Sequence, residues 1–258
     1  MKLTDWLALI GAAAWVPQLV TWVISFFSRS KVVVFPAATA EICYGSFGSA
    51  INIGFVFSAS QKAALITGFA LQVTRSDGAR KEFTWTGLNE TISEITDAYG
   101  NKQIVKRAQI PVALKVGTDD VKDKMVLTLD DEYSKENDRL SIAVVSRIDT
   151  IRSGSGSIEE IFRTQEYRDL LQFRKRNFWW IPGGYRIEIS VSSASPIIFQ
   201  RNIFALELSS IDSDRLRSNV DLLESDARNA IMRNFGQKSL EEAPLVVPVN
   251  AYPRLVRN

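Results

Sequence analysis

The sequence predicts a mainly β protein: an immunoglobulin-like β-sandwich with a helical insertion and a C-terminal helix, preceded by one N-terminal transmembrane helix. Three observations predict this class. Residues 6–28 carry no charged side chain. Short segments in which apolar and polar residues alternate then follow, separated by turn residues, as is typical of half-buried strands. Two stretches with apolar residues at helical spacing interrupt these segments, and a third follows them.

The uncharged segment 6–28 lies between Asp5 and Arg29. As a helix it would extend about 34 Å, enough to cross a hydrocarbon core about 30 Å thick. Pro17 would kink this helix without preventing it from spanning, because neighbouring polar groups or water can satisfy the freed carbonyl. We therefore predict a membrane anchor over residues 1–30. The residues that characterise its spanning part are Trp6, Trp15, Pro17, Gln18, Trp22, Phe26 and Phe27.

Two alternatives for this segment are disfavoured. A secretory signal peptide has a shorter apolar region and small residues at its cleavage site, whereas this one is long and ends in Phe-Phe-Ser-Arg. A buried helix of a soluble protein rarely lacks charge over such a length. A single membrane-spanning helix remains the preferred interpretation.

Charges beside the predicted anchor indicate its orientation. Arg29 and Lys31 follow it directly, whereas Lys2 precedes it. The positive-inside rule then narrowly favours a single-pass protein of the cell membrane with its soluble domain in the cytoplasm. One cysteine, Cys43, is compatible with a reducing compartment.

The body over residues 31–236 is expected to hold the strands. The clearest unit is a hairpin, in which two alternating segments flank the turn residues 76–78 (Ser-Asp-Gly). Pro36 is expected to end the first strand. Because each alternating strand has one apolar face, two sheets packed face to face would bury them all. The expected strands are 31–35, 39–44, 51–58, 65–75, 81–85, 109–116, 124–129, 185–191 and 197–208.

Helical signals place an insertion at about 134–176. Residues 134–151 carry apolar side chains at helical spacing, and Ser157 with Glu160 matches a capping box that begins a second helix. A last helix is expected over 213–235, ending before a glycine. Residues 237–258 contain three prolines and are expected to be an extended tail, which could add a strand to a partner's sheet.

Composition excludes several mechanisms. The chain has no histidine, so Ser-His-Asp catalysis, Cys-His catalysis and His-ligated zinc are excluded. A single cysteine excludes an intramolecular disulfide. The net charge of +2 is too balanced to indicate a nucleic-acid-binding protein. No cofactor is expected.

Acidic residues and Cys43 are the first candidates for chemistry. The clusters 119–120 and 130–132 could bind Mg²⁺ or Ca²⁺ through oxygen ligands, but their spacing matches no calcium loop. Solvated turns at strand ends explain them better. Cys43 follows an apolar residue in a short predicted strand, where a buried structural thiol is expected. We therefore assign no catalytic residue and no metal ligand.

A segment rich in cations and aromatic rings is the best candidate for a functional surface. It could lie against a membrane surface or a partner, and it could also stack nucleic-acid bases. Alternatively, its cations end a helix and its aromatic rings enter the core. The residues concerned are Arg174, Lys175, Arg176, Phe178, Trp179 and Trp180.

These observations favour a membrane-anchored, non-catalytic binding or scaffolding module. Its expected partners are the lipid bilayer, an unidentified protein and, through Gln18 in the spanning helix, a second copy of the chain. Nucleic acid is not expected. Two alternatives stay open: a sensor-effector whose soluble domain binds a ligand and drives assembly of the spanning helices, and a metal-dependent hydrolase using Asp130 and Asp131.

Overall fold

The computed structural model describes residues 14–20, 22, 28–96, 102–110, 112–118, 122–200, 202–237 and 246–256. For residues 90–96, 102–108 and 122–123 it describes the backbone alone.

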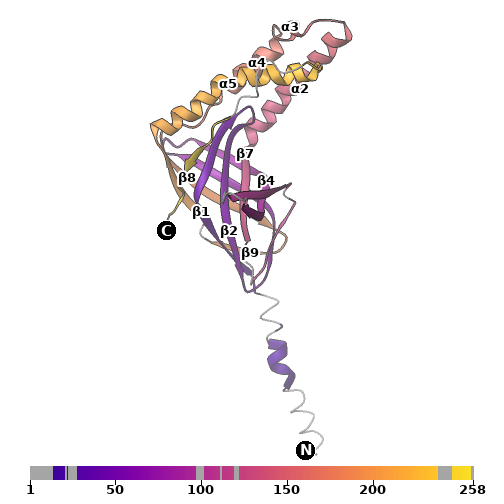
Figure 1. Ribbon diagram of the computed structural model, residues 1–258. Helices are drawn as coiled ribbons and strands as arrows, with labels where there is room; N and C mark the ends of the chain where they lie inside the picture. The colour runs from indigo at the N-terminus through magenta and orange to yellow at the C-terminus, as the bar shows by residue number, and fades with distance from the viewer. Residues whose placement is uncertain are drawn as a thin grey trace, which may run out of the picture.

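The described strands form one curled, mixed sheet (Figure 1). Its main path runs β11-β1-β2-β7-β4-β3-β8-β10-β12, with β5, β6 and β9 paired beside it. The first seven strands are β1 (Ser30–Gly45), β2 (Gly48–Ser60), β3 (Ala64–Arg75), β4 (Arg80–Thr96), β5 (Lys102–Gln109), β6 (Leu114–Val116) and β7 (Lys122–Asp130). The others are β8 (Gly183–Ser193), β9 (Ile197–Gln200), β10 (Ile203–Leu208), β11 (Val249–Ala251) and β12 (Arg254–Leu255).

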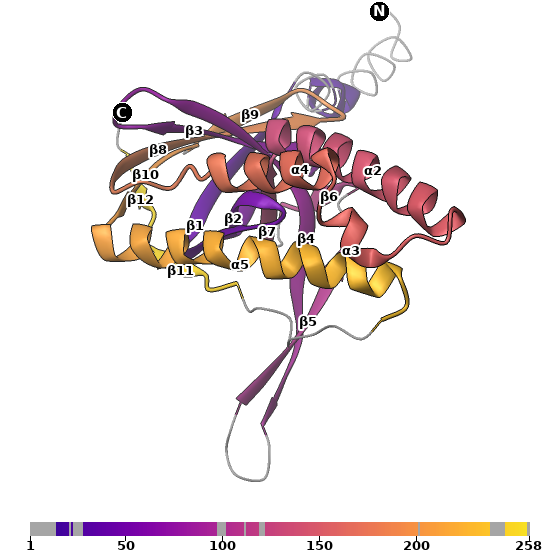
Figure 2. The same ribbon diagram turned by 90° about the horizontal axis from the view of Figure 1, so that it is seen from above.

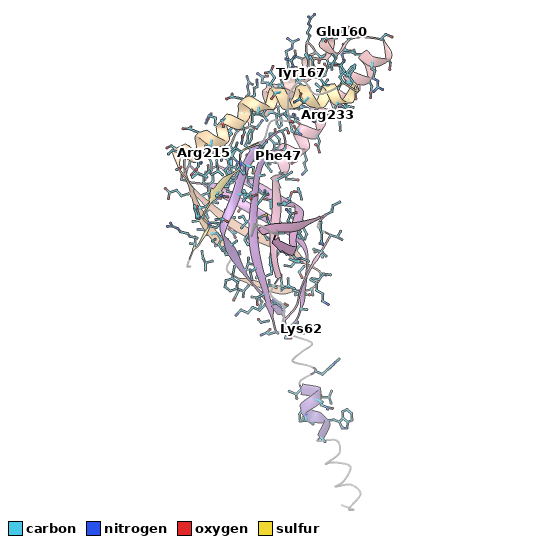
Figure 3. The ribbon with its side chains drawn as sticks, viewed as in Figure 1. Phe47, Lys62, Glu160, Tyr167, Arg215 and Arg233 are labelled. Atoms are coloured by element: carbon cyan, nitrogen blue, oxygen red, sulfur yellow. The ribbon has the colours of Figure 1, made fainter. Side chains whose placement is uncertain are left out.

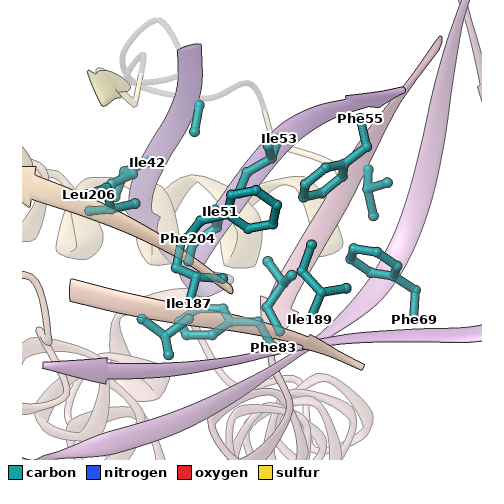
Figure 4. Packing of buried hydrophobic residues seen from close by; sticks show 14 of the residues in the cluster. Ile42, Ile51, Ile53, Phe55, Phe69, Phe83, Ile187, Ile189, Phe204 and Leu206 are labelled. Carbon is teal, nitrogen blue, oxygen red and sulfur yellow. The ribbon is translucent and has the colours of Figure 1, made fainter. Parts of the chain in front are cut away.

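The prediction of a mainly β body with helical additions is confirmed, but the strands do not form the two packed sheets of an immunoglobulin-like sandwich. The physical reason is that alternation defines one buried face for each strand without saying what covers it. Here the sheet curls so that its own strands cover one another. Phe55 of β2, for example, packs against Phe69 of β3 at 5.4 Å and Phe204 of β10 at 6.3 Å between ring centroids (Figure 4).

Local turn and strand signals are partly confirmed. The β3–β4 hairpin forms as predicted: Gly78 has a φ of +88°, and the Arg75 N–H donates to the Ala79 carbonyl at 2.9 Å. Pro36 does not end the first strand, because β1 continues through it with a register shift between Pro36 and Ala40. This irregularity accommodates a residue that has no N–H to donate.

Two short segments pair along the outermost long strands of the curled sheet. β9 pairs in parallel with the start of β1, with Ser30 opposite Ile197. Further along, β11 pairs with β1 and β12 pairs with β10. Since β11 and β12 belong to the single segment 249–255, the end of the chain fills the space between the first and last strands of the curl.

The helices build a second core at one end of the sheet (Figure 2). They are α2 (Asp131–Ser153), α3 (Ile158–Ile161), α4 (Gln165–Arg176) and α5 (Ser210–Asn234). The expected helix from Ser157 is divided into α3 and α4, because Thr164 caps a new helix by accepting from the Tyr167 N–H at 3.3 Å. The core comprises Leu140, Val144, Ile148, Ile151, Ile158, Ile161, Tyr167, Leu170, Leu171, Ala227, Ile231 and Met232.

The predicted anchor is described only in part. Residues 14–20 and 22 are helical, and Trp15 and Trp22 are each 65% exposed. The same helical residues include Pro17 and Gln18, whereas Trp6, Phe26 and Phe27 lie outside the described residues. Within the part of the chain that is described, no helix is both long and apolar enough to cross a membrane.

The pairing of segment 249–255 with β1 and β10 generates a stability prediction. Val249 pairs with Ile42 of β1 and is only 4% exposed. The substitution V249D should lower the free energy of unfolding by at least about 3 kcal/mol, because the new carboxylate is buried without a partner. Urea unfolding followed by circular dichroism measures the loss.

The matched control is N250D, which places the same carboxylate one residue further on, where the side chain is exposed. Its effect should stay within about 0.5 kcal/mol. Equal stability of the two variants would show that the pairing of the C-terminal segment does not stabilise the sheet.

Candidate functional site

The cationic and aromatic segment does not form one surface. Arg174 is 8% exposed, Trp179 is 7% exposed and Trp180 is completely buried. The reason is topological: α4 ends at Arg176, and the chain then crosses into the curled sheet to begin β8 at Gly183. The aromatic rings therefore enter the core, and they cannot meet a membrane or a partner together with the neighbouring cations.

Trp180 lies where the sheet and the helices meet. Its indole Nε1 donates to the Cys43 carbonyl of β1 at 2.9 Å, and its ring stacks on Phe83 of β4 with centroids 5.8 Å apart. The Ser213 hydroxyl of α5 donates to the Trp180 carbonyl at 2.8 Å. One residue thus connects two strands and a helix.

Arg174 is a second internal connection. Its Nε donates to Oδ1 of Asn137 in α2 at 2.9 Å, and its backbone carbonyl accepts from the Tyr44 hydroxyl of β1. Burial lowers the pKa of Arg174 and raises the pKa of both Tyr44 and Tyr133 beside it. The two hydroxyls therefore stay neutral. The Arg174 guanidinium holds α4 against α2, and the Arg174 carbonyl holds it against β1.

Lys175 and Arg176 remain at the surface with acidic neighbours. Lys175 pairs with Glu224 at 2.9 Å, and both side chains are more than 40% exposed. Arg176 lines an open cavity of about 330 Å³ between α2 and α4 that Glu136 and Asp169 also line. Phe178 is half-buried, with the Arg217 guanidinium 4.7 Å from its ring centroid. This mixed charge does not favour a strongly anionic partner.

Most acidic candidates near β7 have structural contacts. Asp130 is 1% exposed, accepts from the Tyr133 N–H at 3.1 Å to cap α2, and pairs with Lys81. Asp131 pairs with Lys135 at 2.6 Å. The expectation of solvated turns is therefore wrong for Asp130. The other cluster, 119–120, lies outside the described residues.

A metal site is not evident from the described side chains. Among them, no group of three or more His, Cys, Asp or Glu residues could hold an ion.

Cys43 is a buried thiol in β1, as expected. Its side chain is 9% exposed, and burial, together with the charge of Glu41, raises its pKa to about 11. Since the thiolate is the reactive form, Cys43 is a poor nucleophile at neutral pH.

One hollow of the described surface was not indicated by the sequence. An open cavity of about 590 Å³ lies on the outer face of the sheet, beside the C-terminal segment. Arg186 of β8 and Arg254 of β12 are exposed there, both opposite Ala205 of β10, and the exposed Glu207 of β10 also lines the cavity. Its lining residues are Thr74, Arg75, Ser76, Gly184, Tyr185, Arg186, Ala205, Leu206, Glu207, Tyr252 and Arg254.

We call this cavity the arginine groove. Arg75, which lines its edge, is held in place by three contacts. It forms an ion pair with Asp77, its guanidinium lies 5.5 Å from the Trp179 ring centroid, and it donates to the Trp179 carbonyl at 3.1 Å. No local motif could have revealed the groove, because its residues come from four strands that are distant in sequence. The alternation in β8 indicated only that Arg186 lies on the polar face.

Comparison with known proteins adds no assignment: no family model, curated protein or solved structure matches the chain.

The environment of Cys43 generates a reactivity prediction. At pH 8 the raised pKa should make the folded thiol react with iodoacetamide at least about 100-fold more slowly than the urea-unfolded chain, because far less thiolate is present. Because the folded-state pKa lies above the unfolded value, the neutral thiol contributes stability below about pH 9. That contribution is lost as the pH rises toward about 11. Mass spectrometry of timed samples measures the rate.

The control is C43S/S146C, which moves the only thiol to an exposed position of α2. Its folded and unfolded chains should react at similar rates. Rapid alkylation of Cys43 in the folded protein would contradict the structural role.

Proposed function

We propose that this chain is a membrane-anchored, non-catalytic binding protein, with its N-terminal segment in the bilayer and its mainly β body presented to a partner. The observation that carries this proposal is the position of the N-terminal helical residues. They precede β1 at the end of the sheet that lies opposite the helices (Figure 1). The anchor and the helical layer are thus at opposite ends of the molecule.

The exposure of these residues supports insertion. Trp15, Val16, Leu19, Val20 and Trp22 are between 50% and 65% exposed. Keeping such side chains in water is unfavourable by roughly 25 cal/mol for each Å² of apolar surface. A bilayer would cover the same side chains and would match the uncharged composition of residues 6–28.

The internal contacts of the reactive candidates favour binding over hydrolysis. The Asp130 carboxylate is already engaged by Lys81 and by the first turn of α2. Asp131 is paired with Lys135 on the helix surface. Cys43 is held as a neutral thiol. These groups maintain the fold, so none is prepared to attack or activate a substrate.

The arginine groove is the binding surface that we assign to the body. Arg186 and Arg254 have exposed guanidinium groups, which recognise carboxylates through paired hydrogen bonds. Tyr252, 64% exposed, adds an aromatic face beside them. This chemistry fits an acidic peptide segment of a protein partner.

Anchoring is tested by charge insertion into the described helical residues. The variant V16R/L19R should move from the membrane pellet to the soluble fraction, because each arginine costs about 2.5–3.5 kcal/mol at the centre of a spanning helix. Carbonate extraction followed by immunoblotting measures the distribution.

The matched control for anchoring is I211R, which changes an apolar residue of α5 that is 65% exposed. It should remain in the membrane pellet. If the unmodified chain itself is extracted by carbonate, the anchor assignment is wrong.

The arginine groove is tested with a fluorescein-labelled peptide in which glutamate and valine alternate. R186Q/R254Q should raise the Kd for this peptide at least about tenfold, because each charge-assisted hydrogen bond contributes about 1.5–3 kcal/mol. Fluorescence anisotropy of the full chain in detergent measures the Kd. The control R215Q/R233Q removes two arginines of α5 and should leave the Kd unchanged. If both variants raise the Kd equally, the peptide responds to the overall charge of the protein and the assignment of the groove is wrong.

A further inference from the structure

The end of the sheet next to the N-terminal segment has its own surface, which we call the N-terminal rim. It consists of residues 28–31, 60–66, 114–118 and 193–198. β1 begins here, β2 ends, β3 begins and β8 ends. The Ser30 hydroxyl donates to the Lys62 carbonyl at 2.6 Å, and the Ala194 N–H donates to the Leu65 carbonyl at 3.1 Å. Figure 3 labels Lys62 at this end, beside the helical N-terminal residues.

The described segments of the N-terminal rim carry cations only. They contain Arg29, Lys31, Lys62 and Lys115 and no Asp or Glu, whereas Asp119 and Asp120, which follow Thr118 in the sequence, lie outside the described residues. Among the described side chains, no carboxylate forms an ion pair with Arg29, Lys31 or Lys115. The helices at the other end differ, because α2 and α5 each interleave acidic and basic residues.

Apolar side chains stand beside these cations. Ile198 of β9 is 44% exposed and is directly opposite Lys31 of β1. Leu65 of β3 is 41% exposed and is directly opposite Lys115 of β6. The rim thus presents two separate pairs, each consisting of one lysine and one aliphatic side chain on adjacent strands. This combination is suited to charged headgroups above an apolar layer.

We infer that the N-terminal rim docks on anionic lipid headgroups of the bilayer that holds the N-terminal segment. This inference rests on the proposed anchor. Arg29 separates the uncharged segment from Ser30, the first residue of β1, so the tether is short and keeps the rim close to the bilayer surface. The two lysines belong to different strand pairs and are spread over the end of the sheet. A broad anionic surface therefore fits them better than a single phosphate ion.

Docking determines the orientation of the body on the membrane. An anionic surface attracts each nearby lysine strongly enough to favour the docked state about fivefold, so Lys31 and Lys115 together favour it about 25-fold. This attraction falls off within about 8 Å at physiological ionic strength. The body should therefore lie against anionic bilayers at low salt and become released from them at high salt.

The experiment uses the full chain as C43S/S195C, with a fluorophore on the exposed Ser195 position of the rim. The chain is reconstituted into vesicles of phosphatidylcholine alone or with phosphatidylglycerol, each containing a headgroup quencher. We expect quenching to be several-fold stronger with phosphatidylglycerol and to fall to the phosphatidylcholine level in 0.5 M NaCl. Adding K31Q/K115Q should abolish the difference between the two lipids.

The control R147Q/R152Q removes two exposed arginines of α2 at the other end of the molecule. It changes the net charge by the same amount as K31Q/K115Q. It should keep the lipid-dependent quenching.

Flotation of the vesicles separates the possible failures. A chain that does not float with phosphatidylcholine vesicles would overturn the anchor. Suppose that the chain floats with both lipids. Equal quenching in the two lipids would then overturn rim docking alone, and so would a K31Q/K115Q variant that keeps the lipid-dependent difference in quenching. If inorganic phosphate at matched ionic strength abolished the quenching, the rim would instead contain a site for free phosphate.

Discussion

The burial of Trp180 between the curled sheet and the helical layer is the constraint on which the arrangement depends. The sheet curls around an apolar interior, and at the helical end that interior is covered by Trp180, Trp179 and Tyr185. Trp180 also accepts from α5 through its carbonyl and donates to β1 through its indole. Because a fully buried indole N–H needs a partner, these contacts fix the helices relative to the strands.

This connection gives the molecule two different ends. One end carries the helical core, whose surface mixes acidic and basic side chains. The other begins at Ser30, and its described segments present Arg29, Lys31, Lys62 and Lys115 beside aliphatic residues. The arginine groove lies on the outer face of the sheet toward the helical end, next to the C-terminal segment that pairs with β10. A tethered body of this kind would keep its groove accessible while the N-terminal rim lies against lipid.

Local signals in the sequence predicted several of the elements but not their assembly. The Ser76–Gly78 turn and the apolar stripes of α2 and α5 depend on neighbouring residues, and they were predictable for that reason. The pairing of the C-terminal segment with the sheet was not predictable, because Val249 pairs with Ile42, more than two hundred residues earlier. A long-range pair of this kind leaves no periodic trace in a sequence.

The candidate site illustrates the same limit. The composition of residues 174–180 correctly indicated that cations and aromatic rings are concentrated there, but composition does not say which side chains face inward. Burial of Trp180 was decided by the path from α4 to β8. The arginine groove and the N-terminal rim could not be found in advance, since each gathers residues from several strands.

The most direct test of the two-ended account is the orientation of the full chain in a nanodisc that contains anionic lipid, observed by cryo-electron microscopy. The account predicts that the density of the curled sheet meets the disc at the end where β1 begins. The helical layer of α2, α4 and α5 should lie on the far side of the sheet, away from lipid. A body whose helices touch the disc would contradict the account, as would a chain that leaves the disc empty.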